Sequence, residues 1–144
     1  MPDQTVLSNQ TVLVADDNEA IRDTTAMILR AEGYSVIEAA DGEEALHEIS
    51  TEACDVVVLD VRMPKRDGFW VVENIDPMPP PPVVVMASAY NFDEETIHRL
   101  GARVSAYLRK PVAPARLLEA VGLAAETTRS QGGTRLPDEP APEL

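Results

Sequence analysis

The sequence predicts an α/β protein in which five parallel strands alternate with five helices around one hydrophobic core. Short valine-rich runs end abruptly in polar residues, and each run is followed by apolar residues at helical spacing. The strand segments are almost continuously apolar, which is typical of a parallel sheet that helices cover on both faces. A length of 144 residues with 44% hydrophobic content suits a single domain of ordinary size.

The strand segments are short, rich in β-branched residues and bounded by polar or proline-rich stretches. In order along the chain they are residues 11–15, 34–38, 55–60, 83–87 and 104–108. Parallel strands need right-handed crossovers, and for five units the commonest doubly wound arrangement is the flavodoxin-like order 2-1-3-4-5. We therefore expect a flavodoxin-like sheet with this strand order.

Each strand segment is followed by a stretch with helical spacing. The helices are expected over residues 19–32, about 41–53, from 68 to before 79, 92–100 and 113–125. Gly33 is well placed to end the first of them. The third must end before the proline run 79–82, because proline lacks the N–H that a helix interior requires.

Two terminal segments lie outside this alternation. Residues 1–10 are expected to form an N-terminal extension, and residues 11–125 the folded domain. Residues 126–144 carry three prolines and little hydrophobic content, so we expect a disordered acidic tail.

Charge and cysteine content exclude several classes of protein. Twelve Lys and Arg against 25 Asp and Glu give a net charge of −13, which argues against direct binding to nucleic acid or an anionic membrane. Cys54 is the only cysteine, so the chain has no internal disulfide. No stretch approaches the about 18 apolar residues of a membrane span, and the start does not resemble a signal peptide. We expect a cytoplasmic protein.

Polar residues follow four of the predicted strands at their carboxyl ends, where open parallel sheets bind ligands. They are Asp16 and Asp17, Asp60, Ser88, which Ala89 follows, and Lys110. In the expected order three of these strands are neighbours, so three carboxylates, a hydroxyl and an ammonium should converge. Carboxylates this close repel one another unless a cation lies among them, and oxygen ligands of this kind suit Mg²⁺. With Lys110, Ser88 and the following N–H as phosphoryl ligands, the residues indicate Mg²⁺-assisted phosphoryl transfer to an aspartate.

This set of motifs resembles the receiver domain of two-component response regulators. The motifs are Val12-Leu13-Val14-Ala15-Asp16-Asp17, Asp60-Val61-Arg62-Met63-Pro64 with Asp67-Gly68, Ala87-Ser88-Ala89, Gly101-Ala102 and Tyr107-Leu108-Arg109-Lys110-Pro111. Each is common by itself, but here they occur in the right order at the ends of the right strands, and the resemblance covers residues 11–125.

The resemblance implies that Asp60 is the phosphoacceptor and takes its phosphoryl group from a phosphohistidine of a sensor histidine kinase or histidine phosphotransfer protein. Mg²⁺ would be held by Asp17 directly, by Asp16 mainly through water, by Asp60 and by the backbone carbonyl of Arg62. The resemblance assigns the catalytic roles to Asp60, Lys110 and Ser88.

The resemblance also implies how the signal leaves the site. Lys110 would pair with the phosphoryl group, and Ser88, followed by Ala89, would move to hydrogen-bond it. Tyr107 would then change rotamer with Ser88 and alter a surface that binds a downstream protein target. The sequence allows a monomer as well as a phosphorylation-dependent dimer.

Simpler interpretations exist for several of these residues. Asp16 and Asp17 could cap the first helix, and Ser88 could cap the fourth, although Asp93 is better placed for that. Tyr107 could be an ordinary packing residue.

Alternatives also remain open for the function. A stand-alone receiver switch is the leading interpretation. The chain could instead be the receiver part of a DNA-binding response regulator whose output domain is absent from it. A Mg²⁺-dependent phosphohydrolase with an aspartyl-phosphate intermediate ranks lower. Such enzymes usually resemble an Asp-x-Asp pattern in which the second acid is the general acid/base, and Arg62 stands at that position here. A receiver fold that signals without phosphate is disfavoured by the full set of acids, Ser88 and Lys110.

Overall fold

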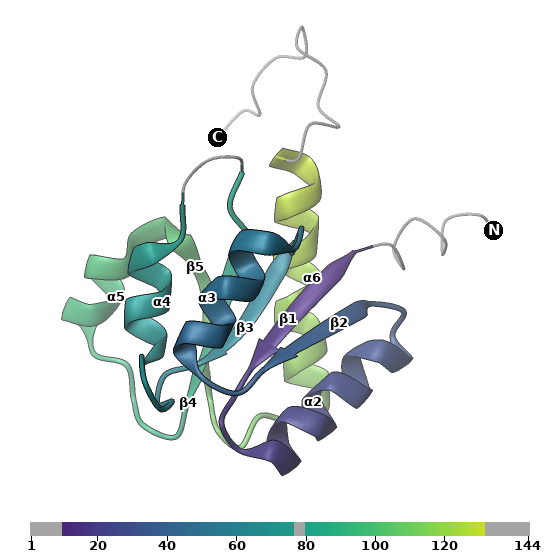
Figure 1. Ribbon diagram of the computed structural model, residues 1–144, viewed down its shortest axis with the longest axis horizontal. Coiled ribbons are helices and arrows are strands. Elements are labelled where there is room, and N and C mark those ends of the chain that lie inside the picture. Colours follow the sequence, from purple (N-terminus) through teal and green to yellow (C-terminus); the bar gives the residue numbers. More distant parts are fainter. Residues whose placement is uncertain (1–9, 77–79, 132–144) are drawn as a thin grey trace, which may run out of the picture.

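The computed structural model describes residues 10–76 and 80–131 and has the expected alternation of strands and helices (Figure 1). The strands are β1 (Thr11–Ala15), β2 (Ser35–Ala39), β3 (Val56–Asp60), β4 (Val83–Ser88) and β5 (Val104–Arg109). The helices are α2 (Glu19–Ala31), α3 (Gly42–Thr51), α4 (Gly68–Asn74), α5 (Glu94–Leu100) and α6 (Pro114–Gln131), with a 3₁₀ turn at Gly101–Arg103 before β5.

All strand pairs are parallel, and the order is β2-β1-β3-β4-β5. The flavodoxin-like prediction is therefore confirmed. β1, β3 and β4 have neighbours on both sides, and the valines and leucines that made their segments continuously apolar are buried on both faces.

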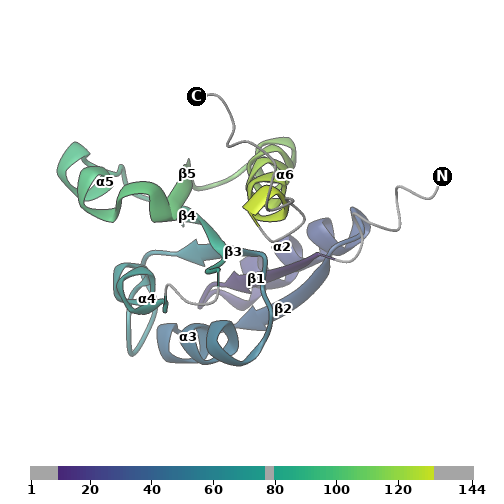
Figure 2. The same cartoon turned by 90° about the horizontal axis from the view of Figure 1, so that it is seen from above.

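The helices divide the core into two layers (Figure 2). α2 and α6 cover one face, where Leu29 and Val121 pack on the valines of the central strands. α3 and α4 cover the other face with α5 beside α4, and Val71 and Leu100 pack there. Consecutive strand residues alternate between these layers, so Val58 faces α2 and α6 whereas Leu59 faces α3 and α4. Among the described residues, no helix combines the length and the apolar character needed to cross a lipid bilayer.

β5 departs from regular pairing by one residue. Val84 lies opposite Val104, but Val85 lies opposite Ala106, so Ser105 is an extra residue in the ladder. The shift changes which face each later residue of β5 occupies. Tyr107 joins the α3–α4–α5 layer, and Leu108 joins the α2–α6 layer.

Helix α6 is longer than the sequence analysis expected. The sequence predicts that residues 126–131 belong to the disordered tail, but they continue the helix. The reason lies in contacts with distant parts of the chain: Thr128 donates its hydroxyl to the carbonyl of Asp55 at 2.8 Å, and Gln10 donates its amide to the carbonyl of Ala125 at 3.1 Å. The remainder of the predicted tail, residues 132–144, and residues 1–9 lie outside the described residues.

Gly42 allows the start of α3 to lie against the loop between β3 and α4. A Cβ at Gly42 would overlap the backbone carbonyl oxygen of Arg66. Backbone atoms cannot move aside as a flexible side chain can, so only glycine fits here without displacing the loop.

We expect Gly42→Ala to lower the free energy of unfolding by about 1–3 kcal/mol, because the new methyl group forces the loop away from α3. Gly122→Ala is the matched control, since a Cβ there meets no atom within 4 Å and Gly122 lies inside α6. The control should gain up to about 1 kcal/mol from helix propensity. Urea denaturation of both variants measures the difference, and equal effects would contradict this packing account.

Candidate functional site

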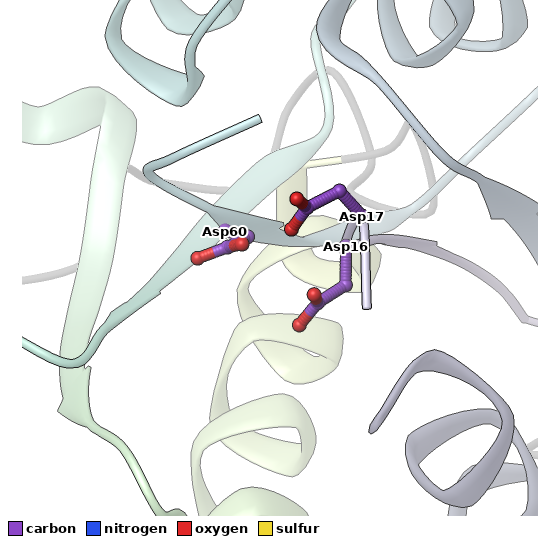
Figure 3. A group of neighbouring side chains, drawn as sticks. All are labelled: Asp16, Asp17 and Asp60. Atoms are coloured by element: carbon purple, nitrogen blue, oxygen red, sulfur yellow. The ribbon is translucent and has the colours of Figure 1, made fainter. Parts of the chain in front are cut away.

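The carboxyl ends of β1 and β3 bring three carboxylates together (Figure 3). Asp60 is the last residue of β3, and Asp16 and Asp17 follow β1 directly. One carboxylate oxygen from each of the three lies within 4.8 Å of the others. Asp16 and Asp60 are buried, whereas Asp17 is exposed. The sequence prediction that these acids converge is therefore met in the structure.

Asp16 is held by hydrogen bonds in a fixed orientation. Its Oδ1 accepts from the backbone N–H of Asn18 at 2.9 Å, and its Oδ2 accepts from Nζ of Lys110 at 2.7 Å. Asn18, not Asp16 or Asp17, is the N-cap of α2, because its side chain accepts from the N–H of Ile21. Neither aspartate therefore caps α2, so capping does not explain why these two acids stand here.

Lys110 joins the site from the end of β5. Its Nζ lies 2.7 Å from Oδ2 of Asp16 and 3.2 Å from Oδ1 of Asp60, so one ammonium bridges two buried carboxylates. Its backbone N–H donates to the carbonyl of Ser88 at 2.8 Å, and the following Lys110–Pro111 peptide is cis. The extra residue at Ser105 places Leu108 on the α2–α6 face of the sheet. Because residues two apart in a strand point to the same face, Lys110 is directed to this face as well.

Ser88 is the buried last residue of β4. Its Oγ accepts a hydrogen bond from the backbone N–H of Tyr90 at 3.0 Å, which leaves its own hydroxyl proton available to an acceptor in the site. Ala89 follows, and its carbonyl accepts from the guanidinium of Arg109 at 3.3 Å. Asp93, not Ser88, is the N-cap of α5.

The loop between β3 and α4 borders the site and contains Arg62. Its first residue, Val61, donates its N–H to the carbonyl of Ala87 and accepts from the N–H of Gly68, so both ends of the loop are tied to strand ends. The guanidinium of Arg62 stacks over the ring of Tyr90, 4.8 Å from its centroid. That the carbonyl of Arg62 is a metal ligand remains a prediction.

Tyr107 lies apart from the acidic cluster, on the opposite face of the sheet. It pairs with Met86 in the β4–β5 ladder, and its ring centroid is 4.8 Å from that of Phe92. Its hydroxyl is buried without a hydrogen-bond partner among the described residues, and burial raises its pKa. A buried hydroxyl without a partner is uncommon in proteins.

Electrostatics in the site are dominated by the burial of like charges. Burial, and then the charge of Asp16, raise the pKa of Asp60 to about 6, although Lys110 opposes the shift. Burial disfavours the charged form of Lys110, but its hydrogen bond to Asp16 and the attraction of both carboxylates raise its pKa above the ordinary value. The site therefore carries an excess of negative charge that one lysine does not offset.

The donor set fits a hard divalent cation. All three groups offer carboxylate oxygens, two of them are buried, and the pKa of Asp60 is raised first by burial and then by the charge of Asp16. Oxygen ligands without nitrogen or sulfur favour Mg²⁺ over zinc or copper. Asp16, Asp17 and Asp60 are the residues that would hold it.

Two contributions to the site were missed in the sequence analysis. The N–H of Asn18 orients Asp16, and the ring of Phe92 covers Tyr107. The first has a signal in the sequence, because asparagine immediately before a helix is a typical N-cap. The second has none, since a contact between a loop and a strand depends on their relative placement.

The raised pKa of Asp60 predicts a pH-dependent stability. Between about pH 4 and pH 6 the folded chain binds more protons at Asp60 than the unfolded chain, so the contribution of Asp60 falls as the pH rises. In EDTA, Asp60→Asn should therefore gain stability over the wild type, by up to about 2–3 kcal/mol above pH 6 and by little near pH 4. Urea denaturation at several pH values measures the difference.

Asp93 provides a control of opposite sign. Its hydrogen bonds to Thr96 lower its pKa, so its contribution is present at neutral pH and is lost as the pH falls. Asp93→Asn should thus lose stability relative to the wild type at neutral pH and not in acid. A difference between Asp60→Asn and the wild type that stays constant from pH 4 to pH 8 would contradict the account of Asp60.

Comparison with known proteins places this geometry in a family. A model of the response regulator receiver domain matches residues 12–122. Transcriptional regulatory protein PdtaR of Mycobacterium tuberculosis is 36% identical over 119 residues, which are 82% of this chain and 58% of that protein. Alkaline phosphatase synthesis transcriptional regulatory protein PhoP of Bacillus subtilis is 40% identical over 108 residues, 74% of this chain and 44% of that protein. The chain thus spans about half the length of the curated relatives it matches.

Solved structures agree. A response regulator receiver domain protein from Methanospirillum hungatei is 32% identical with a TM-score of 0.78, and the match covers 85% of this chain and 98% of that one. The receiver domain of the Francisella response regulator 1452 is also 32% identical, with a TM-score of 0.72 over 83% of this chain and 99% of its own. From its strand order, its acidic strand ends and these matches, the chain belongs to the response regulator receiver domains of two-component systems.

Proposed function

We propose that this receiver domain is a phosphorylation-controlled switch that accepts a phosphoryl group on Asp60 from a phosphohistidine of a sensor kinase or histidine phosphotransfer protein. One observation carries the proposal: a buried carboxylate at the end of β3 lies beside two further carboxylates and within 3.2 Å of a lysine ammonium. In the transfer, an oxygen of Asp60 attacks phosphorus, the bond from phosphorus to the imidazole nitrogen breaks, and the imidazole leaves with its electron pair.

Mg²⁺ bound by Asp16, Asp17 and Asp60 would neutralise charge on the phosphoryl oxygens. Lys110 is positioned to do the same from the other side, because its ammonium already contacts Oδ1 of Asp60. The hydroxyl of Ser88 can donate to a phosphoryl oxygen while it still accepts from the N–H of Tyr90. The N–H of Ala89 and the carbonyl of Arg62 complete the proposed phosphate and metal ligands. The chain would modify only itself and would not act on a separate substrate.

The signal would leave the site through Tyr107. Movement of Ser88 toward a phosphoryl group would open space in the β4–α5 loop, and the unpartnered hydroxyl of Tyr107 disfavours its present position. A new rotamer would change the contact with Phe92 and with it the surface of α5, β5 and α6 that a downstream protein binds. A dimer through this surface is compatible with the same mechanism.

An apolar cavity of about 400 Å³ borders the site between α2 and α6. Asp60 and Lys110 lie at its polar end, and the exposed side chain of Ile21 lies at its margin. A donor that presents a phosphohistidine to Asp60 must cover this end of the sheet. The proposed donor is a cytoplasmic protein that covers this apolar cavity, and the net charge of −13 disfavours direct binding to nucleic acid or an anionic membrane.

A second candidate function has support from the comparisons. PdtaR and PhoP are transcriptional regulators by name, and this chain matches about half of each. The chain would then be the receiver part of a regulator whose output domain binds DNA. The chemistry at Asp60 would be the same in both cases.

Incubation with Mg²⁺ and acetyl phosphate, followed by intact mass measurement, tests the proposal. We expect the wild type to gain one phosphoryl group, and Asp60→Asn or EDTA to abolish the gain. Lys110→Met should slow the gain about 100-fold, because it removes a charged donor aimed at the developing charge. Asp55→Asn, at the opposite end of β3, is the matched control and should be phosphorylated like the wild type.

Phosphorylation that persists in Asp60→Asn would contradict the assignment of the acceptor. A wild type that gains no phosphoryl group and also fails to bind beryllofluoride would overturn the proposed chemistry.

A further inference from the structure

The peptide unit between Asp16 and Asp17 joins two of the proposed metal ligands, which directly follow β1. Asp16 is tied down on one side by its N–H, which donates to the carbonyl of Ala39 on β2 at 3.1 Å. Its own carbonyl accepts from Nη1 of Arg22 at 2.8 Å. A peptide unit is planar, so a hydrogen bond to this carbonyl fixes the plane that joins the Cα atoms of Asp16 and Asp17. Because the N–H of Asp16 is held as well, the rotation between the two units is restricted, which limits the directions in which the side chains leave the chain.

Arg22 reaches this carbonyl from the first turns of α2, and a second contact holds its guanidinium in place. Its Nε lies 3.4 Å from Oε1 of Glu38 on β2. Glu38 also pairs with Arg30, at 3.3 Å, but the Arg30 side chain is 52% exposed and that of Arg22 only 16%. Arg22 thus links α2, β2 and the end of β1, whereas Arg30 contacts β2 alone.

We propose that Arg22 is a positioning residue for the metal site: with Glu38 as its anchor, it holds the Asp16–Asp17 peptide so that both carboxylates point at one cation. The inference rests on the proposed function, in which these carboxylates bind Mg²⁺. The planar guanidinium is essential to it, because a single rigid group donates to the carbonyl through Nη1 and forms an ion pair with Glu38 through Nε. Lysine carries a single nitrogen, so it cannot place one donor at the carbonyl of Asp16 and a separate one beside Glu38, as Nη1 and Nε of Arg22 do.

Charge alone predicts the opposite result, which makes the proposal sharply testable. Arg22 is a cation near a cluster of carboxylates that attracts Mg²⁺. If it acted only through its charge, its removal would make the site more negative and would tighten Mg²⁺ binding. If it positions the ligands, its removal weakens Mg²⁺ binding despite the added negative charge.

The experiment is isothermal titration calorimetry of Mg²⁺ into the full chain carrying Arg22→Gln, Arg22→Lys or Arg30→Gln. We expect the dissociation constant to rise about 10-fold in both Arg22 variants, as for residues that orient metal ligands. Arg30→Gln is the matched control, since it removes the other partner of Glu38 without touching Asp16, and should stay within about twofold of the wild type. Unchanged or tighter binding in Arg22→Gln, or full recovery in Arg22→Lys, would overturn the proposal.

A metal-free measurement separates this inference from the proposed function. In EDTA, NMR relaxation of the Asp17 and Asn18 amides should show greater mobility in both Arg22 variants and not in Arg30→Gln. Unaltered mobility of these amides in a folded Arg22→Gln chain would overturn the positioning role even if Mg²⁺ affinity fell. If the wild type bound no Mg²⁺ and accepted no phosphoryl group, the proposed function would fail, and this readout would still decide whether Arg22 orders the peptide.

Discussion

The repulsion between two buried carboxylates, Asp16 and Asp60, is the constraint on which the rest of the structure depends. Neither is stable in a buried position unless a cation is present, and within the chain Lys110 supplies it. These residues are far apart in the sequence and meet only because β1 lies beside β3, β3 beside β4 and β4 beside β5. The strand order is therefore a requirement of the site as much as of the core.

Much of this arrangement could be predicted from the sequence, because the relevant signals are local. Valine-rich runs that stop at Asp16 and Asp60 mark buried strands with polar ends, and the strand order follows from handedness and crossover rules. The convergence of the acids then follows from the strand order, whereas the side of the sheet on which Lys110 lies depends also on the extra residue in β5.

The differences arise where distant contacts decide the outcome. The end of α6 was placed too early, because its last turns are polar in sequence and are held by Thr128 on Asp55. The position of Arg62 over the ring of Tyr90 and the tilted contact of Tyr107 with Phe92 depend on how loops lie over strand ends, which no sequence periodicity records. The hydrogen bond from Arg22 to Asp16 is likewise invisible in a pattern that shows only an arginine near the start of a helix.

The extra residue in β5 determines the placement of two residues of the proposed switch, Lys110 and Tyr107. With regular pairing, Tyr107 would lie opposite Ala87, on the face of α2 and α6, and Leu108 would lie opposite Ser88. The ammonium and the aromatic ring would then exchange sides of the sheet together. A single insertion thus determines on which side of the sheet both Lys110 and Tyr107 lie. Anyone who transplants this site into another parallel sheet must carry over the irregular ladder along with Lys110 and Tyr107.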